Sequence, residues 1–206
     1  MTDAPAPGRR PTAASMRLDG GHPALDLANT VFGQVGGPIE ADVLATPGDL
    51  VTFARRVGVA GTTTPSSPAA LTAALTLRST LDDLLRARLD GAGDFPARPR
   101  AAMEAFVREA LHAARLAPGA DALAWTWPEQ DAMSPVHRLA HAAAGLLTNP
   151  ADLADLRCCA GCCWLFLDRS RGSGRRWCSM AECGVEAKKR RYVQRRRERR
   201  EGRRIS

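Results

Sequence analysis

The middle of this chain alternates apolar and polar side chains with the period of an α-helix. Residues 69–89 carry leucines three or four positions apart, residues 100–116 place Met, Phe, Val and Leu in the same way, and residues 135–147 form a third apolar, alanine-rich stretch. Side chains at this spacing lie on one face of a helix and can be buried together. The pattern therefore predicts three helices that contribute to a buried core.

Four positions carry the start signal of a helix, which is a short polar residue followed by proline. The polar side chain can cap the first free N–H groups, and proline fits the first helical position because no N–H donor is needed there. The four pairs are Thr46 with Pro47, Ser67 with Pro68, Ser134 with Pro135, and Asn149 with Pro150. They predict a mainly α-helical body, in which the alternating "LAWTWP" of residues 123–128 is either a strand or an extended loop.

The N-terminal end differs from this body in composition. Residues 1–15 are rich in Pro, Ala and Gly without periodicity, so we expect a disordered leader before a helical domain over residues 16–156. No apolar run reaches the roughly 18 to 20 residues that cross a bilayer, and the first residues lack the apolar stretch of a secretion signal. We expect a cytoplasmic protein with no membrane partner, in which thiols stay reduced.

All six cysteines lie between residues 158 and 183, and four of them have the spacing of metal ligands. Cys159 and Cys162 form a C-x2-C pair, Cys178 and Cys183 form a C-x4-C pair, and fifteen residues separate the two pairs. Two such pairs can turn four sulfurs to one point, which is the shell that zinc accepts. The spacing predicts one structural Zn2+ per chain, because four thiolates leave no coordination position for a reacting water.

The two remaining cysteines leave the first pair open to a second interpretation. Cys158 with Cys162 would be a C-x3-C pair, so Cys158 could replace Cys159 as a ligand. In the favoured choice the surplus thiols are Cys158 and Cys163. We interpret them as small buried residues, with redox-responsive thiols as the alternative.

The segment between the two cysteine pairs predicts a two-stranded ribbon. Two apolar or aromatic runs, residues 163–170 and 175–179, are separated by a link rich in Gly and Ser at residues 171–174 that suits a hairpin turn. A module of about thirty residues has too small a core to fold alone, so we expect it to depend on zinc. The expected mini-core consists of Leu165, Phe166, Leu167 and Trp177. Stacking on a nucleic-acid base is the alternative for the tryptophan.

The motifs of this module resemble those of the CGNR zinc finger family. The resemblance rests on "CAGCCWLFLDRSRGSGRRWCSMAECG" (residues 159–184) followed by "EAKKRRY", and "GHPALDLANT" (residues 21–30) is similar to the start of the ABATE domain that accompanies this finger. Val185 and Glu186 stand where the family usually has Asn and Arg. The resemblance implies a transcription regulator in which a helical domain precedes a small zinc-ribbon-like finger with a β-hairpin.

Positive charge is gathered at the C-terminal end of the chain. Residues 157–206 contain 16 Lys and Arg against 5 Asp and Glu, whereas the rest of the chain is mildly acidic. Between Lys188 and Arg204 eleven cations face only two glutamates, and the residue types favour a helix that continues from the second cysteine pair. Because so many like charges repel one another, we expect phosphates to gather around this helix, and a nucleic acid is the natural partner.

Eight cations are the candidate nucleic-acid contacts of residues 157–206, which we interpret as a CGNR-like finger with a basic C-terminal helix. They are Arg175, Arg176, Lys188, Lys189, Arg191, Arg195, Arg196 and Arg199. Phosphate contacts of this kind give affinity without sequence choice. We expect DNA rather than RNA as the partner, with an RNA-binding or ribosome-associated module as the alternative.

Three polar residues interrupt the apolar "HPALDLANT" segment of the helical body. Asp26, Asn29 and Thr30 fall at positions i, i+3 and i+4 of one helical face, so they could line a pocket for a small-molecule effector. Local capping and hydrogen bonding inside a helical junction is the alternative.

Common catalytic motifs are absent from the sequence. There is no P-loop, no dinucleotide-binding glycine motif, no nucleophile elbow and no zinc-protease motif, so we do not expect an enzyme. An enzyme that acts on a small molecule near Asp26, a redox switch through Cys158 or Cys163, and a homodimer are alternatives that the sequence leaves open.

Overall fold

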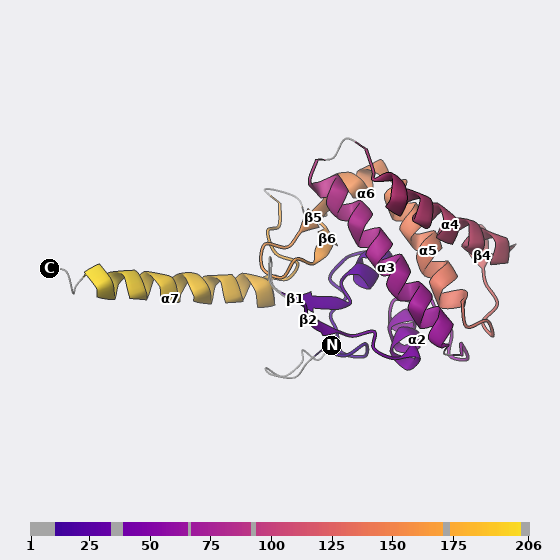
Figure 1. Ribbon diagram of the computed structural model, residues 1–206, viewed down its shortest axis with the longest axis horizontal. Helices are drawn as coiled ribbons and strands as arrows, with labels where there is room; N and C mark the ends of the chain where they lie inside the picture. Colours follow the sequence, from indigo (N-terminus) through magenta and orange to yellow (C-terminus); the bar gives the residue numbers. More distant parts are fainter. Residues whose placement is uncertain (1–10, 34–38, 66, 92–93, 171–173, 203–206) are drawn as a thin grey trace.

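The computed structural model describes residues 11–33, 39–65, 67–91, 94–170 and 174–202, with side chains as far as residue 198. Its helices are α1 (Pro23–Ala28), α2 (Pro47–Arg56), α3 (Pro68–Leu89), α4 (Ala97–Ala113), α5 (Ser134–Leu147), α6 (Pro150–Asp155) and α7 (Val185–Gly202). The first six belong to one body, and α7 projects from that body as a single rod (Figure 1). The predicted mainly α fold is confirmed.

The core of the body lies where the long helices α3, α4 and α5 pack together (Figure 1). The leucines that the helical spacing predicted are buried there, among them Leu81 and Leu85 from α3 and Leu139 and Leu146 from α5. Burial of apolar side chains along one face of each helix is the main stabilising contribution to such a body.

Three of the four predicted helix starts lie at their polar–proline pairs. Thr46 forms a reciprocal capping box at the start of α2, and the side chains of Ser67 and Asn149 accept hydrogen bonds at the starts of α3 and α6. At Ser134 the prediction is wrong by one residue, since the serine is already inside α5 and Met133 occupies the capping position.

The described residues contain three separate two-stranded antiparallel sheets. Their strands are β1 (Val31–Gly33) with β2 (Ile39–Asp42), β3 (Arg115–Pro118) with β4 (Leu123–Thr126), and β5 (Leu156–Cys158) with β6 (Leu165–Leu167). The "LAWTWP" segment is therefore a strand over β4, and the helix expected to reach residue 116 ends at Ala113 because the chain turns into β3.

The C-terminal module has its predicted hairpin, but at another place in the sequence. We expected the ribbon to cross residues 171–174, whereas the observed strands β5 and β6 flank the first cysteine pair. Residues 171–173 lie outside the described residues. Asp168 holds the chain on both sides of them, because it accepts hydrogen bonds from the hydroxyl of Ser170 at 2.6 Å and from the N–H of Arg175 at 2.7 Å. Asp168 thus joins the described residues that precede and follow this gap.

Strand β6 belongs to two cores at once. Leu165 and Leu167 pack into the core of the helical body, while Phe166 packs with two cysteines and Trp164 in a separate cluster. Successive side chains of a strand point to opposite faces, which explains the division. The predicted independent mini-core is therefore wrong for the two leucines, and it is correct for Phe166 and for Trp177, which packs against the cysteine cluster.

The structure describes only the last part of the segment that we expected to be a disordered leader, residues 1–15. Residues 1–10 lie outside the described residues, whereas the turn at residues 12–16 packs on α2, since Arg56 donates to the carbonyls of Ala13 and Met16. Among the described residues, none of the helices combines the length and the apolar character that a bilayer crossing requires.

Candidate metal centre and basic helix

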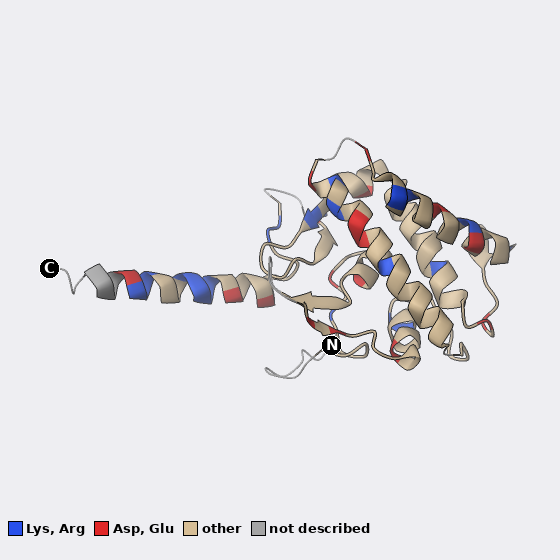
Figure 2. Cartoon of the chain, in the orientation of Figure 1, with Lys and Arg blue, Asp and Glu red and all other residues tan. Residues whose placement is uncertain are grey.

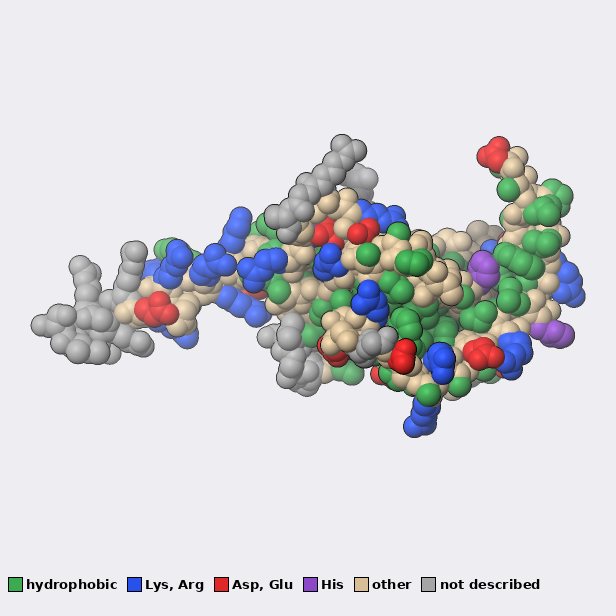
Figure 3. Space-filling model, turned by 90° about the horizontal axis from the view of Figure 1, so that it is seen from above, with side chains coloured by type: hydrophobic (Ala, Val, Ile, Leu, Met, Phe, Trp, Pro, Cys, Tyr) green, Lys and Arg blue, Asp and Glu red, His purple; other side chains and the backbone are tan. Residues whose placement is uncertain are grey.

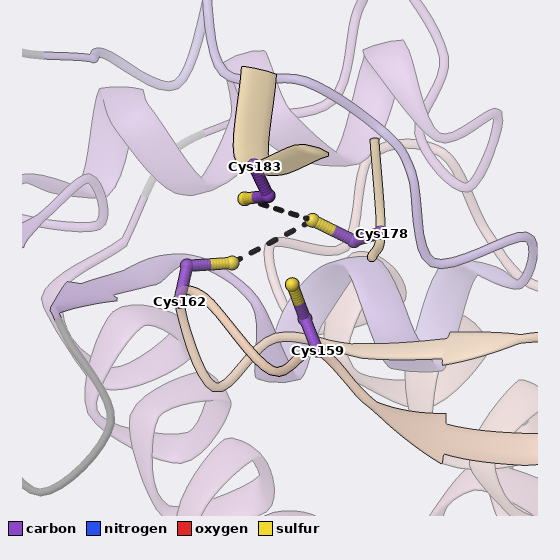
Figure 4. A group of neighbouring side chains, drawn as sticks. All are labelled: Cys159, Cys162, Cys178 and Cys183. Carbon is purple, nitrogen blue, oxygen red and sulfur yellow. Dashed lines mark hydrogen bonds between the residues drawn. The ribbon is translucent and has the colours of Figure 1, made fainter. Parts of the chain in front are cut away.

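The sulfurs of Cys159, Cys162, Cys178 and Cys183 point toward one another (Figure 4). All four lie within 4.8 Å of one another, with 3.5 Å between those of Cys162 and Cys178 and 3.7 Å between those of Cys178 and Cys183. A tetrahedral zinc site with metal–sulfur bonds of about 2.3 Å has sulfur–sulfur edges of about 3.8 Å. The four side chains, which we call the cysteine cage, could therefore hold one metal ion with little rearrangement.

Each cysteine pair of the cage is presented by a tight turn. Cys159 and Cys162 lie in the loop between β5 and β6, which is closed by a hydrogen bond from the N–H of Cys159 to the carbonyl of Trp164 at 2.8 Å. Cys183 lies in a π-helical turn (Met180–Gly184) that leads directly into α7. The second pair is therefore joined to the basic helix without an intervening loop.

Glycine permits the close approach of the two turns at Gly161. A Cβ added at Gly161 would lie 3.3 Å from the Cβ of Cys183, which is tighter than most contacts of this kind. A larger residue at this position would therefore tend to push the two turns, and their sulfurs, apart.

The cysteine cage is partly buried and favours a thiolate, with Cys162 and Cys183 less buried than the other two cysteines. Cys159 and Cys178 are almost completely buried. The thiols of Cys162, Cys178 and Cys183 donate toward Cys159 and lower the pKa of its thiol. A set of four sulfur ligands leaves no coordination position for a reacting water, which is typical of a structural metal site and not of a catalytic one.

The two surplus cysteines lie outside the cage. The interpretation of these two as small buried residues is wrong, since Cys158 is exposed and Cys163 is only partly buried. The thiol of Cys158 is directed at the carbonyl of Cys163, with 3.6 Å between the sulfur and the oxygen. Cys163 has a positive φ of 61°, which turns the chain out of the first cysteine pair and into β6. This geometry places Cys159, and not Cys158, next to Cys162 in the cage.

The finger, residues 156–184, is bound to the body through backbone and side-chain hydrogen bonds. The side-chain amide of Asn29 donates to the carbonyl of Leu165 and accepts from its N–H, both at 2.8 Å. The indole N–H of Trp164 donates to the carbonyl of Val31 at 3.0 Å, and its ring meets Phe32 edge to face at 4.8 Å between centroids. The sequence analysis did not identify the contacts of Trp164 with Val31 and Phe32. No local pattern could reveal them, because the contacting residues are more than 130 positions apart in the chain.

The three polar residues of the "HPALDLANT" segment are hydrogen-bonded within the fold. Asp26 accepts from the N–H of Gly20 at 2.9 Å, and Thr30 donates to the carbonyl of Leu27 and accepts from Arg78. Burial raises the pKa of Asp26 to about 7, although the bond from Gly20 acts in the opposite direction. Asp26 and Thr30 therefore use these polar groups within the fold, and the effector pocket stays a prediction.

A cavity of about 350 Å³ lies where the body meets the first cysteine pair. One wall is the polar side of α3 with Arg78, Asp82 and Arg86, and the opposite wall is aromatic, with Phe32 and Trp164. Asn29 also lines the cavity, whereas Asp26 and Thr30 do not. The cavity touches Cys162, so a molecule bound in it would contact the cysteine cage.

Helix α7 presents cations along its whole described length (Figures 2 and 3). Five of the candidate contacts are exposed on it, namely Lys188, Lys189, Arg191, Arg195 and Arg196. The side chain of the sixth, Arg199, lies outside the described side chains. Glu186 lies in the first turn of α7, where its charge stabilises the helix start, and it also pairs with Arg190 at 3.4 Å.

The two remaining candidate contacts lie in the finger and stack on aromatic rings. Arg175 lies 4.8 Å from the centroid of Phe166 and donates to the carbonyl of Leu167, so part of its donor capacity is used within the fold. Arg176 is exposed and lies over Trp177 at 5.2 Å. Arg176 is therefore the freer of the two.

Two family models match the chain. Residues 21–150 match the model ABATE, described as "Putative stress-induced transcription regulator", and residues 156–196 match the CGNR zinc finger. The first match spans α1 to α5, and the second begins at β5 and extends into α7. A comparison with curated proteins gave no match.

Proposed function

Because the chain belongs to the ABATE family and carries a CGNR zinc finger, we propose that it is a DNA-binding transcription regulator. In this proposal the cysteine cage holds a structural Zn2+, the finger docks on the helical body, and α7 contacts the phosphates of DNA. The observation that carries it is the position of α7, whose first residue, Val185, follows Cys183 by two positions. A metal bound at Cys183 would fix the point and direction at which the basic helix leaves the body.

Zinc is the metal that the donor set favours. Four thiolates in a tetrahedral arrangement suit zinc, whereas carboxylate or carbonyl sets suit magnesium and calcium. The ion would join the two turns, and its contribution would be to the folding of the finger.

The shape of α7 favours duplex DNA over duplex RNA. An α-helix with its side chains is about 10 to 12 Å wide, which matches the roughly 12 Å major groove of B-form DNA. The major groove of A-form RNA is too deep and narrow for a helix to enter. α7 projects from the body as a single rod (Figure 1), so the body does not obstruct its approach to a groove.

A small-molecule effector is the second part of the proposal, and the 350 Å³ cavity is its candidate site. The cavity is bounded by the body on one side and by Cys162 and Trp164 of the finger on the other. A ligand bound there would contact both parts, which is the arrangement that coupling between an effector and a DNA-binding finger requires.

A genome-fragment selection with the metal-loaded chain tests the proposal. We expect duplex DNA fragments to be enriched by the wild type and lost when Arg195, Arg196 and Arg197 are all replaced by alanine. The matched control replaces three exposed arginines of α4, Arg98, Arg100 and Arg108, and should enrich the same fragments as the wild type. Undiminished enrichment by the α7 variant would refute the role of α7, and enrichment of structured RNA in a parallel selection would favour the alternative partner.

A further inference from the structure

Arg17 is a residue of the body that reaches the cysteine cage. Its side chain points one N–H group at the sulfur of Cys178 at 3.9 Å, and its Nε lies 3.1 Å from a carboxylate oxygen of Glu182. The guanidinium also lies over the ring of Trp164, 5.1 Å from the centroid. One side chain thus touches a cage sulfur, the turn that precedes α7, and the tryptophan that docks the finger.

The position of Arg17 is also fixed by contacts within the body. Arg56 of α2 donates to the carbonyls of Ala13 and Met16, at 2.9 and 2.7 Å, and the side chain of Met16 is buried in the core. Asp19 then holds the guanidinium of Arg17 at 2.7 Å. Contacts within the body therefore restrict the guanidinium, which reduces the entropy lost in its contact with the finger.

The negative charge of a metal-loaded cage would be stabilised by the nearby guanidinium of Arg17. A divalent ion bound by four thiolates carries a net charge of −2, and donors around a metal's ligands stabilise that charge and orient the ligands. No cation other than Arg17 is shown in hydrogen-bonding contact with a cage sulfur among the described residues. At the same time Arg17 pairs with Glu182, which directly precedes the ligand Cys183.

We propose that Arg17 is a positioning residue for the metal centre. Its charge balances the negative charge of the metal-loaded cage, and its contact with Glu182 holds the turn from which α7 begins. The inference rests on the proposed function in one respect, namely that the cage holds Zn2+. It adds to that function the contact through which the N-terminal segment of the body acts on the metal and on the direction of the basic helix.

The test measures metal retention by the full chain. The wild type and the variants Arg17→Met and Arg17→Lys are loaded with Zn2+, and the rate at which a chelator removes the metal is followed. We expect Arg17→Met to lose zinc about 10 to 100 times faster, because removal of a partner of a metal ligand typically lowers the metal affinity by about that factor. Arg17→Lys should recover part of the difference, because it restores the charge but not the forked geometry.

A spectroscopic measurement separates this role from a purely structural one. In the Co2+-loaded protein the sulfur-to-metal charge-transfer band should move to lower energy in Arg17→Met, since the sulfur loses its donor, and return toward the wild-type position in Arg17→Lys. Arg108→Met removes an exposed arginine of α4 that pairs with Glu104, and it should change neither the rate nor the band. If Arg17→Met does not fold, Arg17→Gln takes its place as a neutral polar variant.

The outcomes distinguish this inference from the proposed function. A wild type that retains zinc, together with an Arg17→Met variant whose release rate and cobalt band are unchanged, overturns the inference and leaves the zinc finger intact. A wild type that binds no metal overturns both. Faster release and a shifted band in Arg17→Met, with rescue by lysine, support the role of Arg17.

Discussion

The side chain of Asn29 pairs with the backbone of Leu165 through two hydrogen bonds of 2.8 Å, one to its carbonyl and one from its N–H. An amide carries the same donor and acceptor as a peptide group, so Asn29 serves the free edge of β6 as a neighbouring strand would. Both residues are almost completely buried. This pair is one of the polar contacts that fix the finger on the helical body.

Replacing Asn29 with alanine should therefore weaken the whole protein. Leu165 would keep a buried N–H and a buried carbonyl without partners, and two such groups cost about 2 to 5 kcal/mol. Urea unfolding followed by tryptophan fluorescence measures the loss. The control Asn149→Ala removes an exposed helix cap and should cost only about 1 kcal/mol. Equal losses in the two variants would contradict the docking role of Asn29.

Neighbouring residues of β6 should respond differently to truncation. Leu165→Ala opens a cavity in the body core and should destabilise the body by about 2 to 5 kcal/mol, with little change in metal retention. Phe166→Ala removes the ring that packs on the cysteine cluster, so it should speed the release of metal to a chelator. The two effects are measured on the same samples, by unfolding and by metal release. A reversed pattern would mean that the strand faces the opposite way.

The cysteine variants should separate into two classes. Serine at any of the four cage positions removes a sulfur from the metal shell, so we expect loss of bound zinc and of the fold of the finger. Cys158→Ser and Cys163→Ser should keep a stoichiometric metal ion, because both thiols lie outside the cage. Metal analysis of the purified variants gives the answer. Zinc retained in Cys159→Ser and lost in Cys158→Ser would show that the alternative C-x3-C choice is correct.

Asp26 should make stability depend on pH. Its pKa is raised from 3.8 in the unfolded chain to about 7 by burial, so the folded protein binds the extra proton between these values. The stabilising contribution is complete below the unfolded pKa and is lost as the pH rises through 7. Between about pH 5.5 and pH 8.5 the free energy of unfolding should fall by about 2 kcal/mol more in the wild type than in Asp26→Asn. Parallel pH profiles of the two proteins would contradict this assignment.

The helices and the ligand spacing could be predicted because their signals are local. Leucines three or four positions apart and polar–proline pairs act within one or two turns, and α3 and α5 lie where these patterns placed them. The C-x2-C and C-x4-C pairs are equally local, since each is one tight turn. The helix-favouring charged residues after Cys183 likewise predicted α7.

The docking of the finger could not be predicted, because its contacts join residues far apart in the chain. Asn29 and Leu165 are 136 positions apart, and no pattern near either residue identifies the other. The hairpin was misplaced for a related reason. The apolar run after Cys163 contains a strand, as the pattern predicts, but the turn of the first cysteine pair folds this strand back on β5. Asp168 accepts a hydrogen bond from the N–H of Arg175.

The central claim is that α7, which begins directly after the cysteine cage, contacts the phosphates of DNA. The salt dependence of duplex DNA binding tests this claim most directly. The metal-loaded chain is titrated against a labelled duplex at salt concentrations from about 50 to 200 mM. If five or six cations meet phosphates, the logarithm of the binding constant should fall against the logarithm of salt concentration with a slope of about −5. Removing Arg195, Arg196 and Arg197 should reduce the slope to about −2 to −3. A slope near zero, or an unchanged slope in the variant, would contradict the account.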